Sequence, residues 1–305
     1  MGTPEFAVPS LEMLVSEGYE VVAVVTQPDK PKGRGNKIAE PPVKEYAVAK
    51  GILVLQPPKI KTQEFAGQLK ELKPDLIVTC AYGKILPDYV LDIPSFGCIN
   101  VHGSLLPKYR GAAPLQWAII NGDKETGITT MFTDIGMDTG DMLLKEVIQI
   151  PANMTGGELH DKMSVLGAEV LRNTLKKLQG GTLVRTPQAN DKATYAAMIS
   201  KETGLIDWSD SSQSIHNLVR GTDPWPGAYT FYKGERMRVW KTEVVIGETN
   251  HSTFGKICEV MKDGLLIVTG NSLLKILELQ FDSGKRMNVG TYLVGHRMIE
   301  GEILE

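Results

Sequence analysis

The sequence has little cysteine, no long apolar stretch and almost no excess of one charge. Its three cysteines, Cys80, Cys98 and Cys258, are odd in number and far apart. This spacing argues against a disulfide framework and against a zinc-ligand cluster, and it favours a reducing compartment. No apolar run approaches the roughly 20 residues of a membrane-spanning helix, and the first residues lack a secretory pattern. We therefore expect a cytoplasmic protein with no membrane contact and no bound metal.

Length and charge narrow the organisation of the chain further. A chain of 305 residues is long for one hydrophobic core and suits two domains. Its apolar fraction of 42% and charged fraction of 23% are typical of globular proteins. A net charge of -3 gives the whole chain no attraction for nucleic acid, so any such contact must come from a local basic patch.

Strand and helix signals alternate over the first 181 residues. Short β-branched runs, each expected to be a buried strand, occupy residues 21–26, 76–81, 98–102 and 128–132. Helical stretches separate or follow them at residues 9–17, 42–50, 64–72, 113–120 and 156–178. Thr155 and Glu158 have the spacing of a capping box at the start of the last helix. The alternation predicts an α/β domain with a doubly wound, mostly parallel, Rossmann-like sheet over residues 1–181.

The remainder of the chain has a different pattern. Residues 182–200 are polar and are interpreted as a linker. From residue 201 onward, short strands with Gly-containing turns predict a small C-terminal β-barrel of the OB-like kind. The expected strands are residues 228–232, 237–240, 255–260, 265–268 and 273–279.

Polar side chains gather where the third predicted strand ends. Asn100 and His102 are two residues apart, so both point to one face of the strand, near its carboxyl end. A Gly-rich loop downstream carries three carboxylates, Asp134, Asp138 and Asp141. An amide can donate to a developing oxyanion, an imidazole can move a proton, and a carboxylate can orient that imidazole or accept a proton from an amine. The pattern indicates acyl-type transfer to an amine. The alternative is that Asn100 and His102 only anchor the loop.

The residues around this strand resemble the signature of the 10-formyltetrahydrofolate-dependent formyltransferases. The matching motif is Asn-x-His followed by Ser-Leu-Leu-Pro-x-x-Arg-Gly over residues 100–111, with an Asp in the later loop. The resemblance implies that Asn100, His102 and Asp138 are catalytic. It also implies that 10-formyltetrahydrofolate binds at the loop formed by Ser104, Leu105, Leu106 and Pro107.

Several further segments resemble the branch of this family that acts on methionyl-tRNA: residues 2–7, 27–35, 110–114, 138–142 and 223–227. The resemblance implies formyl transfer to the α-amino group of methionyl initiator tRNA. It also implies tRNA contacts from the basic residues of one loop, Lys30, Lys32, Arg34 and Lys37. Without the resemblance, the composition of that loop is explained equally well by a solvated basic segment with no partner. In the barrel, Arg236 and Arg238 are expected to share one side of a hairpin and contribute a basic face. We expect a monomer.

The sequence departs from the family pattern at its start. Members usually open with a short apolar strand before a Gly-Thr-Pro turn, whereas only Met1 precedes that turn here. We therefore expect the natural chain to begin further upstream. Three alternatives remain for the function. The amine can belong to an amino-sugar nucleotide or to glycinamide ribonucleotide, although the second relative lacks a barrel. A non-catalytic RNA-binding protein is disfavoured by the intact Asn100, His102 and Asp138.

Overall fold

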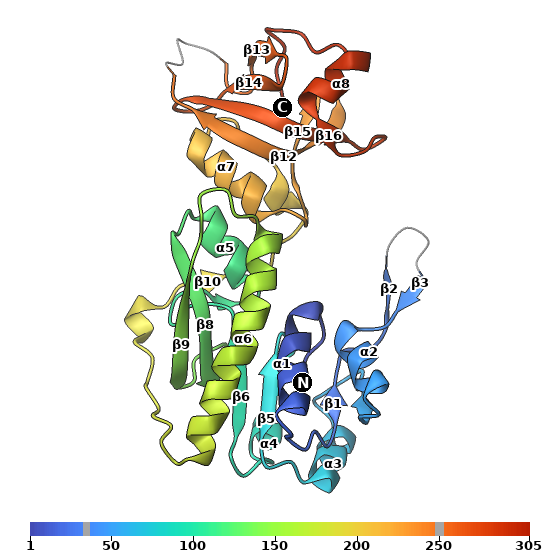
Figure 1. Cartoon of the computed structure of the whole chain (residues 1–305), viewed down its shortest axis with the longest axis vertical. Coiled ribbons are helices and arrows are strands. Elements are labelled where there is room, and N and C mark those ends of the chain that lie inside the picture. The colour runs from blue at the N-terminus through green and yellow to red at the C-terminus, as the bar shows by residue number, and fades with distance from the viewer. Residues whose placement is uncertain (33–36, 248–252) are drawn as a thin grey trace. The chain divides into compact units, whose positions relative to one another are not determined.

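The computed structural model describes residues 1–32, 37–247 and 253–305, with only the backbone of Lys32 and Lys37 (Figure 1). The chain forms two compact units. The first comprises Met1–Pro114, Glu125–Gln149 and His160–Ala197. The second comprises Leu115–Lys124, Ile150–Leu159 and Met198–Glu305. No helix within these described ranges is long and apolar enough to cross a bilayer.

Strands and helices alternate over the first 181 residues as the sequence predicts, and the short elements η2 and β10 follow within the predicted linker. The strands are β1 (Val24–Val25), β2 (Lys30–Lys32), β3 (Lys37–Ala39), β4 (Val54–Leu55), β5 (Ile77–Cys80), β6 (Cys98–His102), β7 (Arg110–Gly111), β8 (Glu125–Phe132), β9 (Met142–Gln149) and β10 (Tyr195–Ala196). The helices are η1 (Glu5–Ala7), α1 (Val8–Ser16), α2 (Pro42–Ala49), α3 (Gln63–Leu72), α4 (Asp88–Leu91), α5 (Pro114–Ile120), α6 (Gly156–Gln179) and η2 (Asn190–Lys192). The capping box at the start of α6 is confirmed, since the Thr155 hydroxyl accepts from the Glu158 N–H and the Glu158 carboxylate accepts from the Thr155 N–H.

The main sheet of the first unit has the strand order β5-β6-β8-β9. Strands β5 and β6 are parallel, and β1 pairs in parallel with β4. Strand β8 is antiparallel to both of its neighbours in this sheet, β6 and β9. Helix α6 lies against one face, where Gly167 lets it approach Val101 and Ile128. On the other face, Phe65 of α3 belongs to the same buried cluster as Ile77 and Cys98. The predicted doubly wound α/β fold is confirmed.

The beginning of the chain lies between β1 and β5. The Gly2 N–H donates to the Val25 carbonyl, and the amino group of Met1 donates to the Val78 carbonyl at 2.6 Å. A cavity of about 620 Å³ continues between the two strands beyond Met1. Its described lining residues do not include the predicted catalytic trio, so it is separate from that site.

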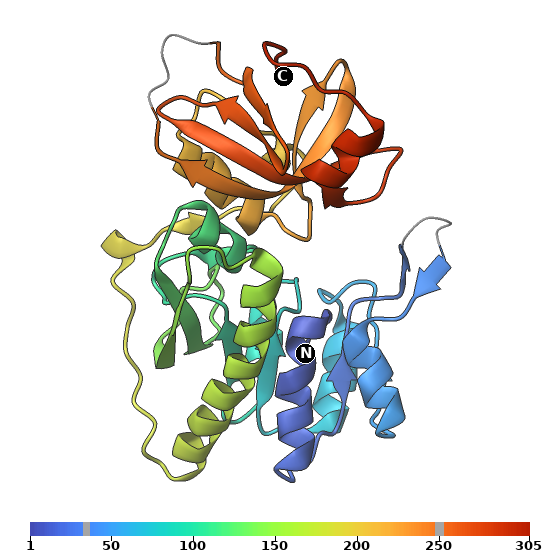
Figure 2. The same ribbon diagram turned by 45° about the horizontal axis from the view of Figure 1, so that its top comes forward.

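The second unit contains an antiparallel sheet with the strand order β11-β12-β15-β14-β13, and β16 pairs with β15. The C-terminal residues close this sheet, since Glu305 exchanges backbone hydrogen bonds with Phe231 of β11 and the Leu304 N–H donates to Gly255 beside β13. Figure 2 shows the curved strands from another side. The predicted small barrel is confirmed, with the elements η3 (Glu202–Gly204), α7 (Ser212–Gly221), β11 (Ala228–Tyr232), β12 (Glu235–Val245), β13 (Ile257–Met261), β14 (Gly264–Val268), β15 (Leu273–Phe281), β16 (Met287–Asn288) and α8 (Val289–Gly295).

Candidate active site

Strand β6 presents Asn100 and His102 on the same face, as the two-residue spacing predicts. The Thr79 hydroxyl on the neighbouring strand donates to Asn100 Oδ1 at 2.9 Å. With Oδ1 bonded to Thr79, Nδ2 is the remaining polar atom of the amide and its hydrogen-bond donor. Nδ2 has no protein partner among the described residues, so it remains available as a donor to a ligand.

His102 is 5% exposed and is held at both ring nitrogens. Its Nε2 lies 2.9 Å from the Tyr109 carbonyl oxygen. A carbonyl can only accept, so Nε2 carries the proton of this hydrogen bond. Nδ1 faces Asp138 Oδ2 at 3.7 Å. The imidazole therefore has a fixed orientation, with one nitrogen turned toward a carboxylate.

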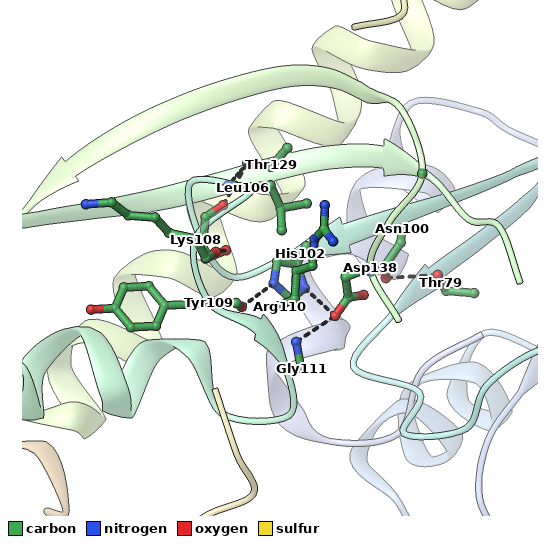
Figure 3. Close-up of polar contacts among 12 residues, drawn as sticks. Thr79, Asn100, His102, Leu106, Lys108, Tyr109, Arg110, Gly111, Thr129 and Asp138 are labelled. Carbon is green, nitrogen blue, oxygen red and sulfur yellow. Dashed lines mark hydrogen bonds and ion pairs between the residues drawn. The ribbon is translucent and has the colours of Figure 1, made fainter. Parts of the chain in front are cut away.

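Asp138 lies in the loop between β8 and β9, in a left-handed backbone conformation with φ 54°. The Gly111 N–H donates to its Oδ2 at 2.8 Å, which places the carboxylate beside His102. Figure 3 shows Asn100, His102 and Asp138 pointing toward one another. The three residues singled out from the sequence thus come together from two segments of the chain, strand β6 and the loop between β8 and β9.

The two competing carboxylates of the same loop have other partners. Asp134 Oδ1 accepts from the Gly136 N–H at 3.0 Å and from the Thr139 hydroxyl at 2.6 Å. Asp141 forms an ion pair of 3.1 Å with Arg185. Asp134 therefore shapes the loop and Asp141 binds a neighbouring segment. Of the three, only Asp138 lies within 4 Å of a His102 ring nitrogen among the residues that the structure describes, at 3.7 Å.

The loop Ser104 to Pro107 is stabilised by its own polar groups. The Ser104 hydroxyl is buried and donates to the Lys108 carbonyl at 2.6 Å. The Thr129 hydroxyl on β8 donates to the Ser104 carbonyl at 2.7 Å and accepts from the Leu106 N–H at 3.1 Å. The Lys145 ammonium on β9 donates to the Leu106 carbonyl, and burial lowers the pKa of Lys145. Leu106 itself is 1% exposed. Ser104 and Leu106 thus hold the loop, while Leu105 and Pro107 are half-buried.

The basic loop of the sequence forms the antiparallel hairpin of β2 and β3. Lys30 is exposed and donates to Gln27 Oε1 at 3.0 Å. At the base of the hairpin, the Asp29 carboxylate accepts hydrogen bonds from Lys44 Nζ and from Gln56 Nε2, both at 2.7 Å. Arg34, and the side chains of Lys32 and Lys37, lie outside the described residues, so their predicted tRNA contacts stay predictions.

Sequence reasoning missed the part of the site that follows α6. Strand β10 pairs in parallel with β7, so residues interpreted as a linker lie along the loop after His102. The Thr194 carbonyl and hydroxyl accept from the N–H groups of Arg110 and Tyr109 at 2.8 and 2.9 Å. The Gln188 side chain reaches the loop of Asp138. These contacts join residues 50 to 85 positions apart, and no local pattern signals them.

Two family models match the chain over almost its whole length. The formyl transferase model matches residues 1–175, and the model of the formyl transferase C-terminal domain matches residues 198–297. The chain therefore belongs to the formyl transferase family. In the described residues, no three His, Cys, Asp or Glu side chains are grouped so that they can hold a metal ion.

Within that family, the most similar relatives share one activity in their names. The chain is 64% identical over 304 residues to a methionyl-tRNA formyltransferase of Acetivibrio thermocellus, covering 100% of this chain and 98% of the relative. It is 61% identical to a methionyl-tRNA formyltransferase of Ruminiclostridium cellulolyticum, with the same coverage. The chain is thus an enzyme of the methionyl-tRNA formyltransferase group, and the resemblance noted in the sequence is confirmed.

A solved structure supports the fold alone. A sugar 3N-formyl transferase, crystallised in the presence of dTDP and 5-N-formyl-THF, superposes with a TM-score of 0.68 at 18% identity. The match covers 93% of this chain and 97% of that one. The architecture of both units is therefore shared with a formyltransferase whose acceptor is a sugar.

Proposed function

We propose that the chain transfers the formyl group of 10-formyltetrahydrofolate to the α-amino group of methionyl initiator tRNA. The products are N-formylmethionyl-tRNA and tetrahydrofolate. The observation that carries the choice of acceptor is the 64% identity, over the full chain, to a methionyl-tRNA formyltransferase. Because that acceptor belongs to translation, the enzyme works in the cytoplasm. It acts as a monomer and needs neither a membrane nor a metal.

The Asn100, His102 and Asp138 side chains are the catalytic residues of this proposal. As the amine attacks the formyl carbon, negative charge develops on the formyl oxygen. Asn100 Nδ2 has no protein partner among the described residues and donates to that oxygen, a contact that strengthens as the charge grows. His102 Nδ1 faces Asp138 at 3.7 Å, and this pair accepts the proton lost by the amine, directly or through a water. The same pair returns a proton to the leaving folate nitrogen.

The folate lies against the loop of Ser104, Leu105, Leu106 and Pro107. Since the Ser104 and Leu106 side chains are buried within that loop, its contacts with the folate come from the loop backbone and from Leu105 and Pro107. A pocket of about 440 Å³ includes Ile85, beyond the end of β5, and Ile135 of the Asp138 loop among its lining residues. Both isoleucines are exposed, at 55% and 77%, and offer apolar surface to a flat ring system.

The tRNA is held by two regions. The hairpin of β2 and β3 carries Lys30, Lys32, Arg34 and Lys37, which contact phosphates at the acceptor end. We assign residues 1–181 to a catalytic domain, 182–200 to the connection and 201–305 to a tRNA-binding barrel. Arg236 and Arg238 both contact Asp282, at 2.9 Å in each ion pair, so they lie on one side of the barrel as the sequence predicts.

A formyl-transfer assay with purified enzyme and 10-formyltetrahydrofolate tests the acceptor. Charged methionyl initiator tRNA is compared with an amino-sugar nucleotide at equal concentration. The second candidate rests on the fold shared with a sugar 3N-formyl transferase. We expect rapid formylation of the charged tRNA and none of the sugar nucleotide. Faster formylation of the sugar nucleotide would overturn the proposed acceptor, while leaving membership of the formyl transferase family intact.

A further inference from the structure

The side chain of Gln188 bridges the two loops that form the active site. Its Oε1 accepts from Arg110 Nε at 3.1 Å and from Arg110 Nη2 at 2.8 Å. Its Nε2 donates to the Asp138 carbonyl and to the Gly140 carbonyl, both at 2.8 Å. All four hydrogen-bonding positions of the amide are therefore used. Gln188 is half-buried, although the residues on either side of it are exposed.

The partners of this amide determine which way it points. A guanidinium can only donate, so the atom facing Arg110 must be the amide oxygen. Backbone carbonyls can only accept, so the atom facing Asp138 and Gly140 must be the amide nitrogen. A flipped amide would place donors against donors and acceptors against acceptors. The orientation of Gln188 is therefore fixed by its partners, and among the other residue types only asparagine, one methylene shorter, carries the same carboxamide.

Arg110 is 2% exposed and forms no ion pair with a carboxylate in the described ranges of the chain. Its guanidinium donates instead to neutral oxygens. These are Gln188 Oε1 and Asn190 Oδ1, and the second accepts at 2.7 Å. A buried cation without acceptors is costly, which gives Arg110 a strong tendency to keep these bonds. Arg110 therefore anchors Gln188 in place.

The four residues Arg110, Gln188, Asp138 and Gly111 form a closed ring of contacts. Gln188 holds the backbone of Asp138 through its carbonyl, while the Gly111 N–H holds the Asp138 carboxylate at 2.8 Å. Gly111 follows Arg110 directly in β7, so the same anchor sets both contacts. Asp138 needs this support because its left-handed φ of 54° is unfavourable for a residue with a side chain.

We propose that Gln188 is a positioning residue for formyl transfer, which holds Asp138 at the distance and angle that its pairing with His102 requires. The inference rests on the proposed function of Asp138. Gln188 touches no reacting atom in this scheme, and its whole effect passes through the Asp138 loop. A residue that only stabilised the fold could make the same four hydrogen bonds. The test must therefore separate an effect on the position of Asp138 from an effect on the stability of the enzyme.

The first test measures kcat and both KM values of the full-length enzyme. Gln188→Ala should lower kcat about 10–100-fold, as loss of a supporting contact or a 1 Å displacement does, with both KM values close to wild type. Gln188→Glu keeps acceptors for Arg110 but places carboxylate oxygens against the two carbonyls, so kcat should fall as far. Val184→Ala, the control, alters a site of the same segment that is 70% exposed and outside this ring of contacts, and should stay within about threefold. Wild-type kcat for Gln188→Ala or Gln188→Glu would overturn the proposal.

The second test is a double-mutant cycle with Asp138→Ala. If Gln188 acts only through Asp138, then Gln188→Ala should cause little further loss of kcat in the Asp138→Ala background. An equal loss of kcat in both backgrounds would show independent roles and would overturn the proposal. Thermal unfolding of each variant confirms that folded enzyme is compared. Failure of the proposed function has a different signature, because it would appear as poor formylation of charged tRNA by the wild-type enzyme.

Discussion

In the first unit, the loops that carry Asn100, His102 and Asp138 are held by directional hydrogen bonds, whereas the barrel of the second unit is held by apolar packing. The site loops depend on buried or half-buried polar groups such as Thr79, Ser104, Arg110, Thr129 and Gln188. The barrel core is a cluster of aliphatic and aromatic side chains, many of them fully buried, including Met237, Val239, Leu265, Leu274 and Leu279.

The difference follows from what each region has to do. Apolar contacts are non-directional, so a barrel core tolerates small shifts and contributes mainly free energy of folding. Hydrogen bonds fix angles as well as distances, and a transferring proton or a developing charge requires both. Substitutions in the site loops should therefore lower kcat and leave the free energy of unfolding nearly unchanged. Substitutions in the barrel core should lower the free energy of unfolding and leave kcat per folded molecule nearly unchanged.

The catalytic residues should give the largest effect. Asn100→Ala removes the free amide donor, and loss of one oxyanion donor typically lowers turnover by about 10²–10³-fold. Asp138→Asn keeps an acceptor for the Gly111 N–H but removes the charge facing His102, and should cost at least as much. Steady-state kinetics with charged tRNA measures both. Asp134→Asn is the control, since it keeps an oxygen for its Gly136 and Thr139 contacts and should lose little.

A barrel-core substitution should show the opposite behaviour. Met237 is 0% exposed and belongs to the buried cluster of the second unit. Met237→Ala should lower the free energy of unfolding by about 2–5 kcal/mol, the usual cost of such a truncation. Chemical denaturation followed by fluorescence measures this, with Met198→Ala, at a site 79% exposed, as control. A loss of kcat per folded molecule as large as that of Asn100→Ala would remove the distinction between the two regions.

A smaller effect is expected from a buried histidine of the second unit. His216 on α7 contacts the Thr242 hydroxyl at 2.9 Å and the Ala152 carbonyl at 3.3 Å. Burial lowers the pKa of His216 below its ordinary 6.5, and the neighbouring Arg220 charge lowers it further. As pH falls below 6.5, the unfolded chain gains a proton that the folded chain resists, so stability should decrease.

Denaturation at pH 7.5 and pH 5.5 of wild type and His216→Gln tests that linkage. The glutamine amide keeps polar contacts at the site but cannot titrate. The loss of stability on acidification should therefore be smaller in His216→Gln than in wild type, while His296→Gln, in an exposed position, should behave as wild type. An equal loss in His216→Gln and wild type would show that another group is responsible.

Much of the architecture could be predicted because local pattern and packing agree. The run from Cys98 to His102 contains the β-branched residues Ile99 and Val101, and it forms β6 with those bounds. Strand β11 likewise occupies the predicted residues 228–232. Helix α7 was missed because its sequence contains Ser, Asn and His, which are weak helix formers. Its stability comes instead from a Ser211 cap and from the burial of Ile215 and Val219 in the barrel core.

The candidate site was only partly predictable from the residues alone. Two polar residues on one strand face follow from the strand period, so Asn100 and His102 could be paired in advance. Spacing does not choose between Asp134, Asp138 and Asp141, because loop conformation decides which carboxylate turns toward His102. Gln188 could not be found at all. It lies 50 residues from Asp138, in a polar segment whose composition resembles that of a linker.

The most direct test of the account separates chemistry from tRNA binding in one set of single-turnover experiments. The rate at saturating substrates and the tRNA concentration giving half that rate are measured for wild type, Asp138→Asn and Arg34→Ala. The account predicts that Asp138→Asn lowers the saturating rate by about 10² or more and leaves the tRNA dependence unchanged. Arg34→Ala should raise the tRNA concentration that gives half the saturating rate. It should leave both the saturating rate and the folate dependence unchanged. A near-normal saturating rate in Asp138→Asn, or a change of the same parameter in both variants, would contradict it.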